Sequence, residues 1–83
     1  MKKSKGISVT IQANGNVNSS ADISEEGYTP IGVIGISPNV YGVVPELWNV
    51  DQDTQVLHYR ARNNNNRQVS LTIWYDILYI KGN

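Results

Sequence analysis

The clearest pattern of hydrophobic and polar positions lies near the end of the chain, over residues 69–80. Side chains alternate there with a period of two, which is typical of a β-strand. One face carries Val69, Leu71, Ile73, Tyr75, Ile77 and Tyr79. The other face begins polar and ends apolar, with Trp74, Leu78 and Ile80 as its large apolar members. We expect this second face to be covered by the protein's own two-sheet core or, alternatively, by a partner subunit.

Two further segments alternate in the same way and predict half-buried strands. Residues 7–13 place Ile7, Val9 and Ile11 on one face, after a basic lead at residues 1–5 that we expect to be solvated. Residues 55–62 set Leu57, Tyr59 and Ala61 against a polar face with His58. Each strand should bury one face and expose the other.

The middle of the chain predicts two more strands, both interrupted by Gly or Pro. Residues 28–37 are almost wholly apolar, which favours a strand covered on both faces. Pro30 indicates a strand start or a sheet edge, and Gly32 and Gly35 indicate bulges or close backbone contacts. Residues 40–44 predict a strand that ends at Pro45 and continues beyond a bulge over residues 47–50.

Polar, turn-forming segments separate these strands. Residues 14–20 contain an Asn-Gly step, a strong hairpin signal, and residues 21–24 could form a short return strand. Residues 51–54 and the four consecutive asparagines at 63–66 predict further turns. The fold expected is all-β: a small, jelly-roll-like antiparallel β-sandwich of about five to seven strands, with residues 6–83 as a single domain.

Composition narrows the function classes. Val and Ile, nine of each, favour β-structure. An 83-residue chain has a thin core, and without Cys it must be supported by tight packing, a metal or oligomerisation. Seven basic and seven acidic residues, dispersed along the chain, argue against nucleic-acid binding. No apolar run is long enough for a transmembrane helix, so we expect no membrane insertion.

The sequence offers little for catalysis. His58 is the single histidine, no G-x-S-x-G motif surrounds a serine, and Glu25 and Glu26 are adjacent, so they point to opposite faces of a strand. Asp51 and Asp53 have the spacing of calcium ligands but lack the Gly-bearing loop and the closing Glu. We therefore expect no enzyme activity, no metal site and no cofactor.

A binding site is the better-supported prediction. Aromatic and polar residues gather near one predicted strand and loop: Tyr41, Trp48, Asn49, Asp51 and Asp53. An aromatic ring can cover the apolar face of a sugar while amide and carboxylate groups fix its hydroxyls. The alternative is that Trp48 is a core aromatic residue, which its large area makes common.

Four motifs in order resemble the C-terminal head domain of bacteriophage and prophage tail-fibre, or receptor-binding, proteins. They are an opening strand with an Asn/Ser-rich turn (ISVTIQANGNVNSSADIS), a Gly-punctuated strand (GYTPIGVIGI), an Arg-Asn step into a polar turn (ARNNNN), and a terminal LYIK. Together they span residues 7–81, nearly the whole chain. A fibre shaft, which normally precedes such a head, is not part of the sequence.

This resemblance implies a non-catalytic head that closes a fibre as a homotrimer and binds a host cell-surface receptor, often a saccharide. Trp74, Leu78 and Ile80 are then the expected subunit contacts. The expected location is the tail-fibre tip of a virion, after synthesis in the bacterial cytoplasm. A capsid fibre or accessory virion protein, or a stand-alone bacterial carbohydrate-binding or adhesion module, remain the alternatives.

Overall fold

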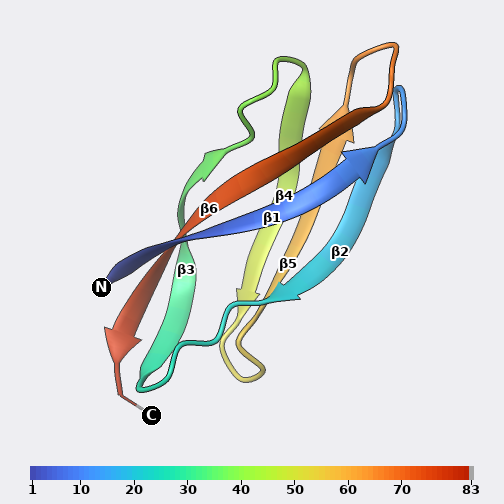
Figure 1. The fold of residues 1–83 in the computed structure, drawn as a ribbon. Helices are drawn as coiled ribbons and strands as arrows, with labels where there is room; N and C mark the ends of the chain where they lie inside the picture. The colour runs from blue at the N-terminus through green and yellow to red at the C-terminus, as the bar shows by residue number, and fades with distance from the viewer. Residues whose placement is uncertain (83) are drawn as a thin grey trace.

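The computed structural model describes residues 1–82, which form six β-strands and no helix (Figure 1). The strands are β1 (Lys2–Ile11), β2 (Asn16–Asp22), β3 (Tyr28–Ser37), β4 (Val43–Asp51), β5 (Val56–Asn63) and β6 (Val69–Lys81). The number and class of elements confirm the all-β prediction.

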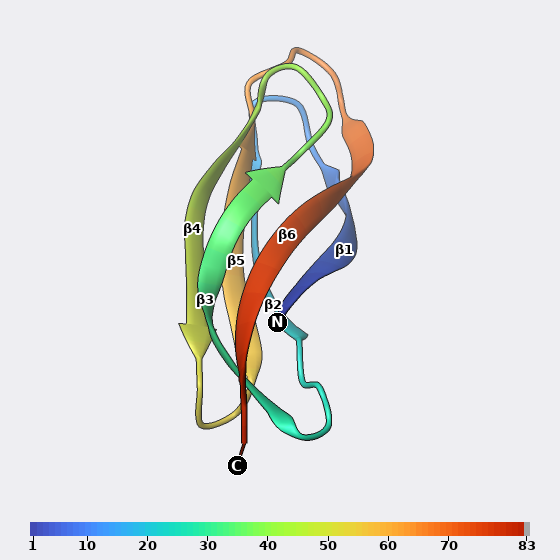
Figure 2. The same ribbon diagram turned by 90° about the vertical axis from the view of Figure 1, so that its left-hand side faces the viewer.

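The six strands form two three-stranded sheets packed face to face (Figure 2). Sheet A has the order β1-β6-β3, and sheet B has the order β2-β5-β4. Every strand pair is antiparallel. This is the small antiparallel β-sandwich that the alternating pattern predicted, with β6 and β5 as the two central strands.

The core between the sheets is built from the alternating faces of the central strands. Tyr75 of β6 faces Tyr59 of β5, with ring centroids 6.0 Å apart. The other buried apolar residues are Ile11, Ile23, Val43, Leu57, Ala61, Val69, Ile73, Ile77 and Tyr79. The inward faces predicted for residues 55–62 and 69–80 are therefore confirmed.

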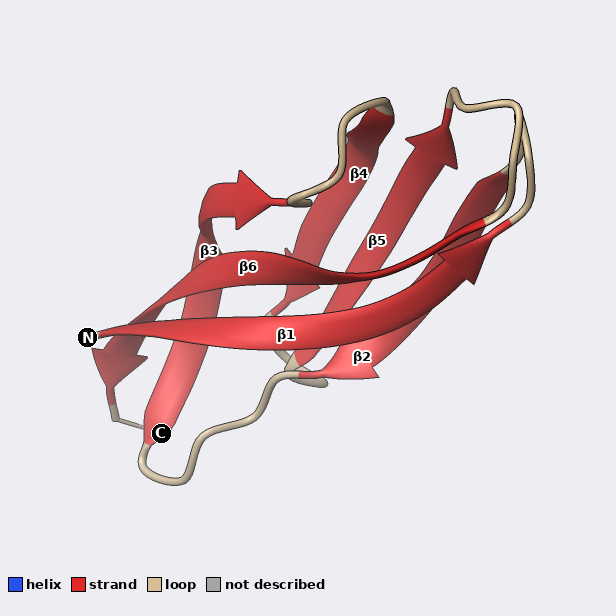
Figure 3. Cartoon of the chain, turned by 45° about the horizontal axis from the view of Figure 1, so that its top comes forward, coloured by secondary structure: helices blue, strands red, loops and turns tan. Residues whose placement is uncertain are grey.

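The connections differ from the sequence prediction at the Asn14-Gly15 step. Among the six strands only β4 and β5 form a hairpin within one sheet, whereas the other connections cross between sheets (Figure 3). Asn14 adopts a left-handed conformation, with φ of 55°, as an Asn-Gly turn requires. However, β1 pairs with β6 and β2 pairs with β5, so the predicted hairpin is wrong. The chain returns immediately as β2, and residues 16–20 are strand rather than turn.

Strand β1 begins earlier than the alternation predicts. Lys2 pairs with Leu78 and Lys5 with Tyr75, so most of the expected solvated lead is part of sheet A. Lys3 Nζ lies 3.2 Å from Glu25 Oε1, and Lys5 Nζ donates a hydrogen bond to Glu25 Oε2. These two hydrogen bonds, that of Lys5 foremost, lower the pKa of Glu25. They attach the start of β1 to the loop after β2.

Strands β3 and β4 are edge strands, and both are irregular. Register shifts fall at Gly32, Gly35 and Pro45, which confirms the predicted bulges. The expectation that β3 is covered on both faces is wrong, because Ile34 is 56% exposed at the second bulge. Strand β4 starts at Val43 rather than at residue 40, since Val43 N donates to the Val40 carbonyl and closes a turn through Gly42, whose φ is +88°.

Candidate functional site

The five residues predicted to form one binding site lie in three places. Tyr41 precedes β4, Trp48 lies within it, and Asp51 ends it. Because a strand rises roughly 3.3 Å per residue, Tyr41 and Asp51 lie at opposite ends of the sandwich. Asp53 follows in the β4–β5 turn.

Asp51 is engaged in its own turn. Its Oδ1 accepts hydrogen bonds from the backbone N–H groups of Asp53, at 3.0 Å, and Thr54, at 3.4 Å. The backbone hydrogen bond of Thr54 is the main cause that lowers the pKa of Asp51. This carboxylate therefore stabilises the β4–β5 turn.

Trp48 and Asn49 point to opposite faces of sheet B. Trp48 pairs with the buried Tyr59 and belongs to the inner face, whereas Asn49 pairs with His58 on the outer face. Trp48 is nevertheless 42% exposed, because β4 is an edge strand and the core opens beside it. The indole is thus partly a core residue, as the alternative held, and partly a surface residue.

Trp48 lines an open groove of about 400 Å³ between the edge strands β3 and β4. The other lining residues are Val33, Ile34, Gly35, Ile36 and Pro45. The β3 bulge between Val33 and Gly35 contributes the exposed side chain of Ile34. None of the six lining residues has a side chain that can ionise. The groove can therefore hold an apolar face of a ligand, but it offers no general acid, base or nucleophile.

Polar groups border the groove on the β4 side. A smaller hollow of about 200 Å³ is lined by Glu46, Leu47, Trp48 and Asn49. Glu46 is held by two arginines of β5: its Oε1 lies 3.2 Å from Arg60 Nε and its Oε2 lies 3.1 Å from Arg62 Nε. An amide and a positioned carboxylate beside an aromatic ring are groups that can bind sugar hydroxyls.

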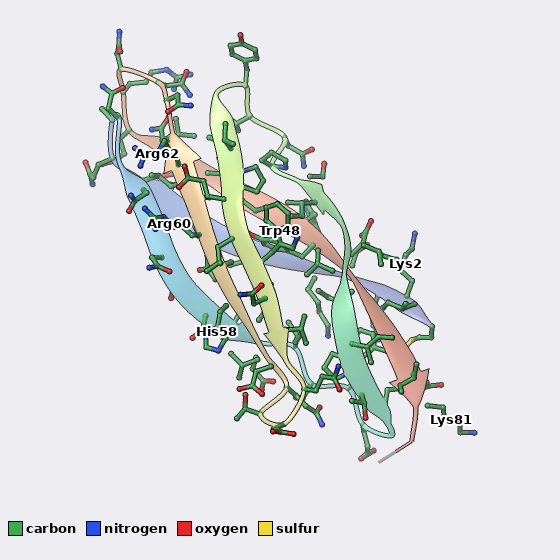
Figure 4. All side chains as sticks on the ribbon, turned by 180° about the vertical axis from the view of Figure 1, so that it is seen from behind. Lys2, Trp48, His58, Arg60, Arg62 and Lys81 are labelled. Atoms are coloured by element: carbon green, nitrogen blue, oxygen red, sulfur yellow. The ribbon has the colours of Figure 1, made fainter. Side chains whose placement is uncertain are left out.

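His58 lies on the outer face of sheet B in line with Arg60 and Arg62 (Figure 4). Its cross-strand neighbours are Ser20 and Asn49. Within residues 1–82 no three His, Cys, Asp or Glu side chains gather as metal ligands would.

The outer face of sheet A carries the three residues predicted as subunit contacts. Trp74 is 43% exposed and Ile80 is 52% exposed, and Leu78 is half-buried. Their neighbours across the sheet include Gly6, opposite Trp74, and Gly32, opposite Leu78. A Cβ on Gly6 would lie 2.9 Å from two Trp74 ring carbons, so the indole packs closely on this glycine. Within one chain, this face is not part of the core.

Sequence reasoning missed Ile34 and Pro45 as groove residues. The signals were present, since Gly35 and Pro45 indicate bulges in their strands. A bulge interrupts the regular alternation of side chains along a strand. Here the bulge between Val33 and Gly35 leaves Ile34 exposed, although β3 was expected to be covered on both faces. What could not be read from the pattern is that the two irregular strands face each other.

Comparison with known proteins adds no assignment: no protein-family model, curated protein or solved structure matches the chain. Over residues 1–82, no helix long and apolar enough to span a membrane is found.

Proposed function

We propose that this chain is the non-catalytic head of a bacteriophage or prophage tail fibre, which binds a saccharide on the host cell surface and associates as a homotrimer. The observation that carries the binding function is the Trp48 groove, an apolar hollow with an indole in its wall and polar groups at its border. The virion assignment, with the fibre tip as location, comes from the sequence resemblance.

The groove suits a sugar ring better than a reaction. The exposed part of the Trp48 indole can stack on the C–H face of a pyranose, as aromatic rings bury area without needing a charge. Asn49 and Glu46 then lie on the adjacent hollow, where their oxygen and nitrogen atoms can meet ring hydroxyls. The ion pairs of Glu46 with Arg60 and Arg62 hold its carboxylate in place.

The first prediction is that Trp48→Ala weakens saccharide binding about tenfold, because one aromatic contact of this kind contributes about 1.4 kcal/mol. An array of bacterial cell-surface polysaccharides identifies a ligand, and titration calorimetry of that ligand gives the affinity. Trp48→Phe retains a ring and should lose less.

The matched control is Val44→Ala, which removes an exposed apolar side chain from the outer face of the same strand. We expect its saccharide affinity to equal that of the parent protein. Equal affinities of the parent and of a folded Trp48→Ala variant would remove the groove from the proposal.

Self-association is proposed through the outer face of sheet A. Trp74 and Ile80 expose apolar surface, and Gly32 leaves open space beside Leu78, with no atom within 4 Å of where its Cβ would be. Small neighbours let a second backbone approach the sheet closely. A thin single-chain core gains stability from such contacts.

The second prediction is that the parent protein has the native mass of a trimer, and that Ile80→Asp converts it to a monomer. The expected cause is the burial of an unpaired carboxylate at the interface. Light scattering coupled to size exclusion measures the mass. Because Ile80 is exposed in the single chain, the variant should still fold; Leu78→Asp tests the same face at a half-buried position.

Val44→Asp serves as the control for this experiment, since it places the same charge on the outer face of the other sheet. Its mass should equal that of the parent. A parent protein that is monomeric at high concentration would contradict the trimer and favour the stand-alone carbohydrate-binding or adhesion module. A trimer found in a capsid fibre rather than a tail fibre would retain the fold and the binding function but move the attachment site.

A further inference from the structure

Three loops converge at one end of the sandwich: residues 12–15, 38–42 and 64–68, which we call the loop end (Figure 3). Backbone hydrogen bonds join them. Asn14 N donates to the Asn65 carbonyl at 3.0 Å, and Asn64 N donates to the Gly42 carbonyl at 2.9 Å. Asn63 N, at the end of β5, donates to the Gly15 carbonyl at 2.8 Å. Three segments distant in sequence therefore form one connected surface.

Asparagine side chains fix this surface further. Asn65 Nδ2 donates to the Tyr41 carbonyl at 2.9 Å, and Asn65 N donates to Asn63 Oδ1 at 2.9 Å. Gly42 has a φ of +88°, and a Cβ there would lie 2.8 Å from Asn65 Nδ2. The backbone at Tyr41 and Gly42 is thus held against the β5–β6 loop.

Tyr41 is presented by this fixed backbone and is 97% exposed. It is the most exposed of the large apolar side chains in residues 1–82. A tyrosine ring offers a large amphipathic contact area at a low cost in side-chain entropy, and a fixed backbone lowers that cost further. Nothing in the packing of the sandwich accounts for an aromatic residue at this position.

Most side chains of the loop end are amides. Five exposed amide side chains of the loop end make no hydrogen bond with any described residue: Gln12, Asn14, Asn64, Asn66 and Gln68. Each offers donors and acceptors together, which matches the dual character of a sugar hydroxyl. Arg67 is the single ionisable side chain apart from the Tyr41 phenol in the three loops. Polyhydroxylated ligands fit this composition better than apolar or strongly charged ones.

The loop end is also remote from both ends of the chain. Strand β1 runs toward it and β6 runs away from it, so that Lys2 and Lys81 lie toward the opposite end of a molecule 45 Å long (Figures 1 and 4). A ligand can therefore reach the three loops without passing whatever adjoins either terminus.

From this placement we propose that the loop end is a second saccharide-contact surface, in which the Tyr41 ring stacks on a sugar and exposed amides of the three loops bind its hydroxyls. Tyr41 does not line the Trp48 groove, so this surface is independent of it. Its existence does not depend on the trimer or on the groove being occupied.

The test uses the whole chain and a printed array of oligosaccharides that contain hexoses, N-acetylhexosamines and uronic acids. The parent protein is compared with Tyr41→Ala, Tyr41→Phe and Trp48→Ala, and every saccharide that binds is then titrated. We expect at least one saccharide whose affinity falls about tenfold in Tyr41→Ala and is retained in Tyr41→Phe. The thermal midpoint of Tyr41→Ala should equal that of the parent, because the ring makes no packing contact.

The Trp48→Ala variant separates the two surfaces. A saccharide whose affinity falls in Tyr41→Ala and is retained in Trp48→Ala supports the loop end as its contact surface. If every saccharide that binds loses affinity in Trp48→Ala alone, the groove is supported and the inference about the loop end is overturned. An array in which no saccharide depends on Tyr41, including one in which nothing binds, also overturns the inference. If the protein attaches to host cells through Tyr41 and protease treatment of the cells abolishes that attachment, the ligand of this surface is a protein instead.

Discussion

Replacing Asn63 by Ala is expected to lower the free energy of unfolding by about 3 kcal/mol. Asn63 is fully buried at the end of β5. Its Nδ2 donates to the carbonyls of Ile11, at 3.1 Å, Gln12, at 3.2 Å, and Arg67, at 2.8 Å. Its Oδ1 accepts the backbone N–H of Asn65. Alanine would leave the three carbonyls and the Asn65 N–H group without this partner, at a buried position where water cannot easily take the place of the amide. A buried polar group without a hydrogen bond is destabilising.

The effect should be large for a domain of this size, whose total stability is on the order of 4–12 kcal/mol. Urea unfolding measures it, with Asn66→Ala as the matched control. Asn66 belongs to the same asparagine run but is exposed, and its side chain makes no hydrogen bond with a described residue. Asn66→Ala should unfold at the parent midpoint. If both variants unfolded together, the buried amide network would have no part in stability.

The second large effect is that removing the hydroxyl group from two tyrosines of β6 should change the free energy of unfolding in opposite directions. Tyr79→Phe is expected to cost about 1.5 kcal/mol, because the Tyr79 hydroxyl donates to the buried Ile23 carbonyl at 2.6 Å. Tyr75→Phe is expected to stabilise the fold by about 1 kcal/mol. The Tyr75 hydroxyl is buried and has no hydrogen-bond partner among the described residues, so its removal relieves a desolvation cost.

The two variants control for each other, since both delete one oxygen from a buried ring on the same face of the same strand. Urea unfolding at neutral pH is the measurement. Burial is the main cause that raises the pKa of each phenol to about 12, so both phenols are protonated at neutral pH. Equal destabilisation by the two substitutions would show that the Tyr75 hydroxyl has a partner in solution.

Raising the pH should destabilise the parent through these same groups. The unfolded chain releases the two phenolic protons near pH 10, whereas the folded chain retains them until about pH 12. The unfolded state therefore binds fewer protons in this interval, and stability falls as the pH rises through it.

The sequence was sufficient to select candidate binding residues by their chemical type, but not to show which of them lie close together in space. The sequence identifies aromatic and amide residues near β4, yet Tyr41 lies on a loop, Trp48 on the inner face of the strand and Asp51 at the strand's end. Although these residues are close in sequence, the whole length of β4 separates Tyr41 from Asp51. The sequence predicts a turn over residues 63–66, whereas Asn63 is the last residue of β5 and is the one asparagine of the four that is fully buried.

The sequence by itself determined that strands lie along residues 55–62 and 69–80 and which of their side chains face the core. Alternation along residues 55–62 and 69–80 reports burial directly, since the side chains of a strand point to opposite faces in turn. The bulges at Gly32, Gly35 and Pro45 were also readable, because these residues lack a side chain or an N–H group. Such properties depend on a few neighbouring residues.

Only the tertiary structure decided which strands pair and what the turns connect. The Asn14-Gly15 step bends the chain in the same way whether it joins two strands of one sheet or crosses to the other sheet. The choice depends on β6, more than fifty residues later, which pairs with both β1 and β3 and so leaves β2 to β5. Which strands pair depends on the burial of all six strands together, and a pattern of a few neighbouring residues cannot predict it.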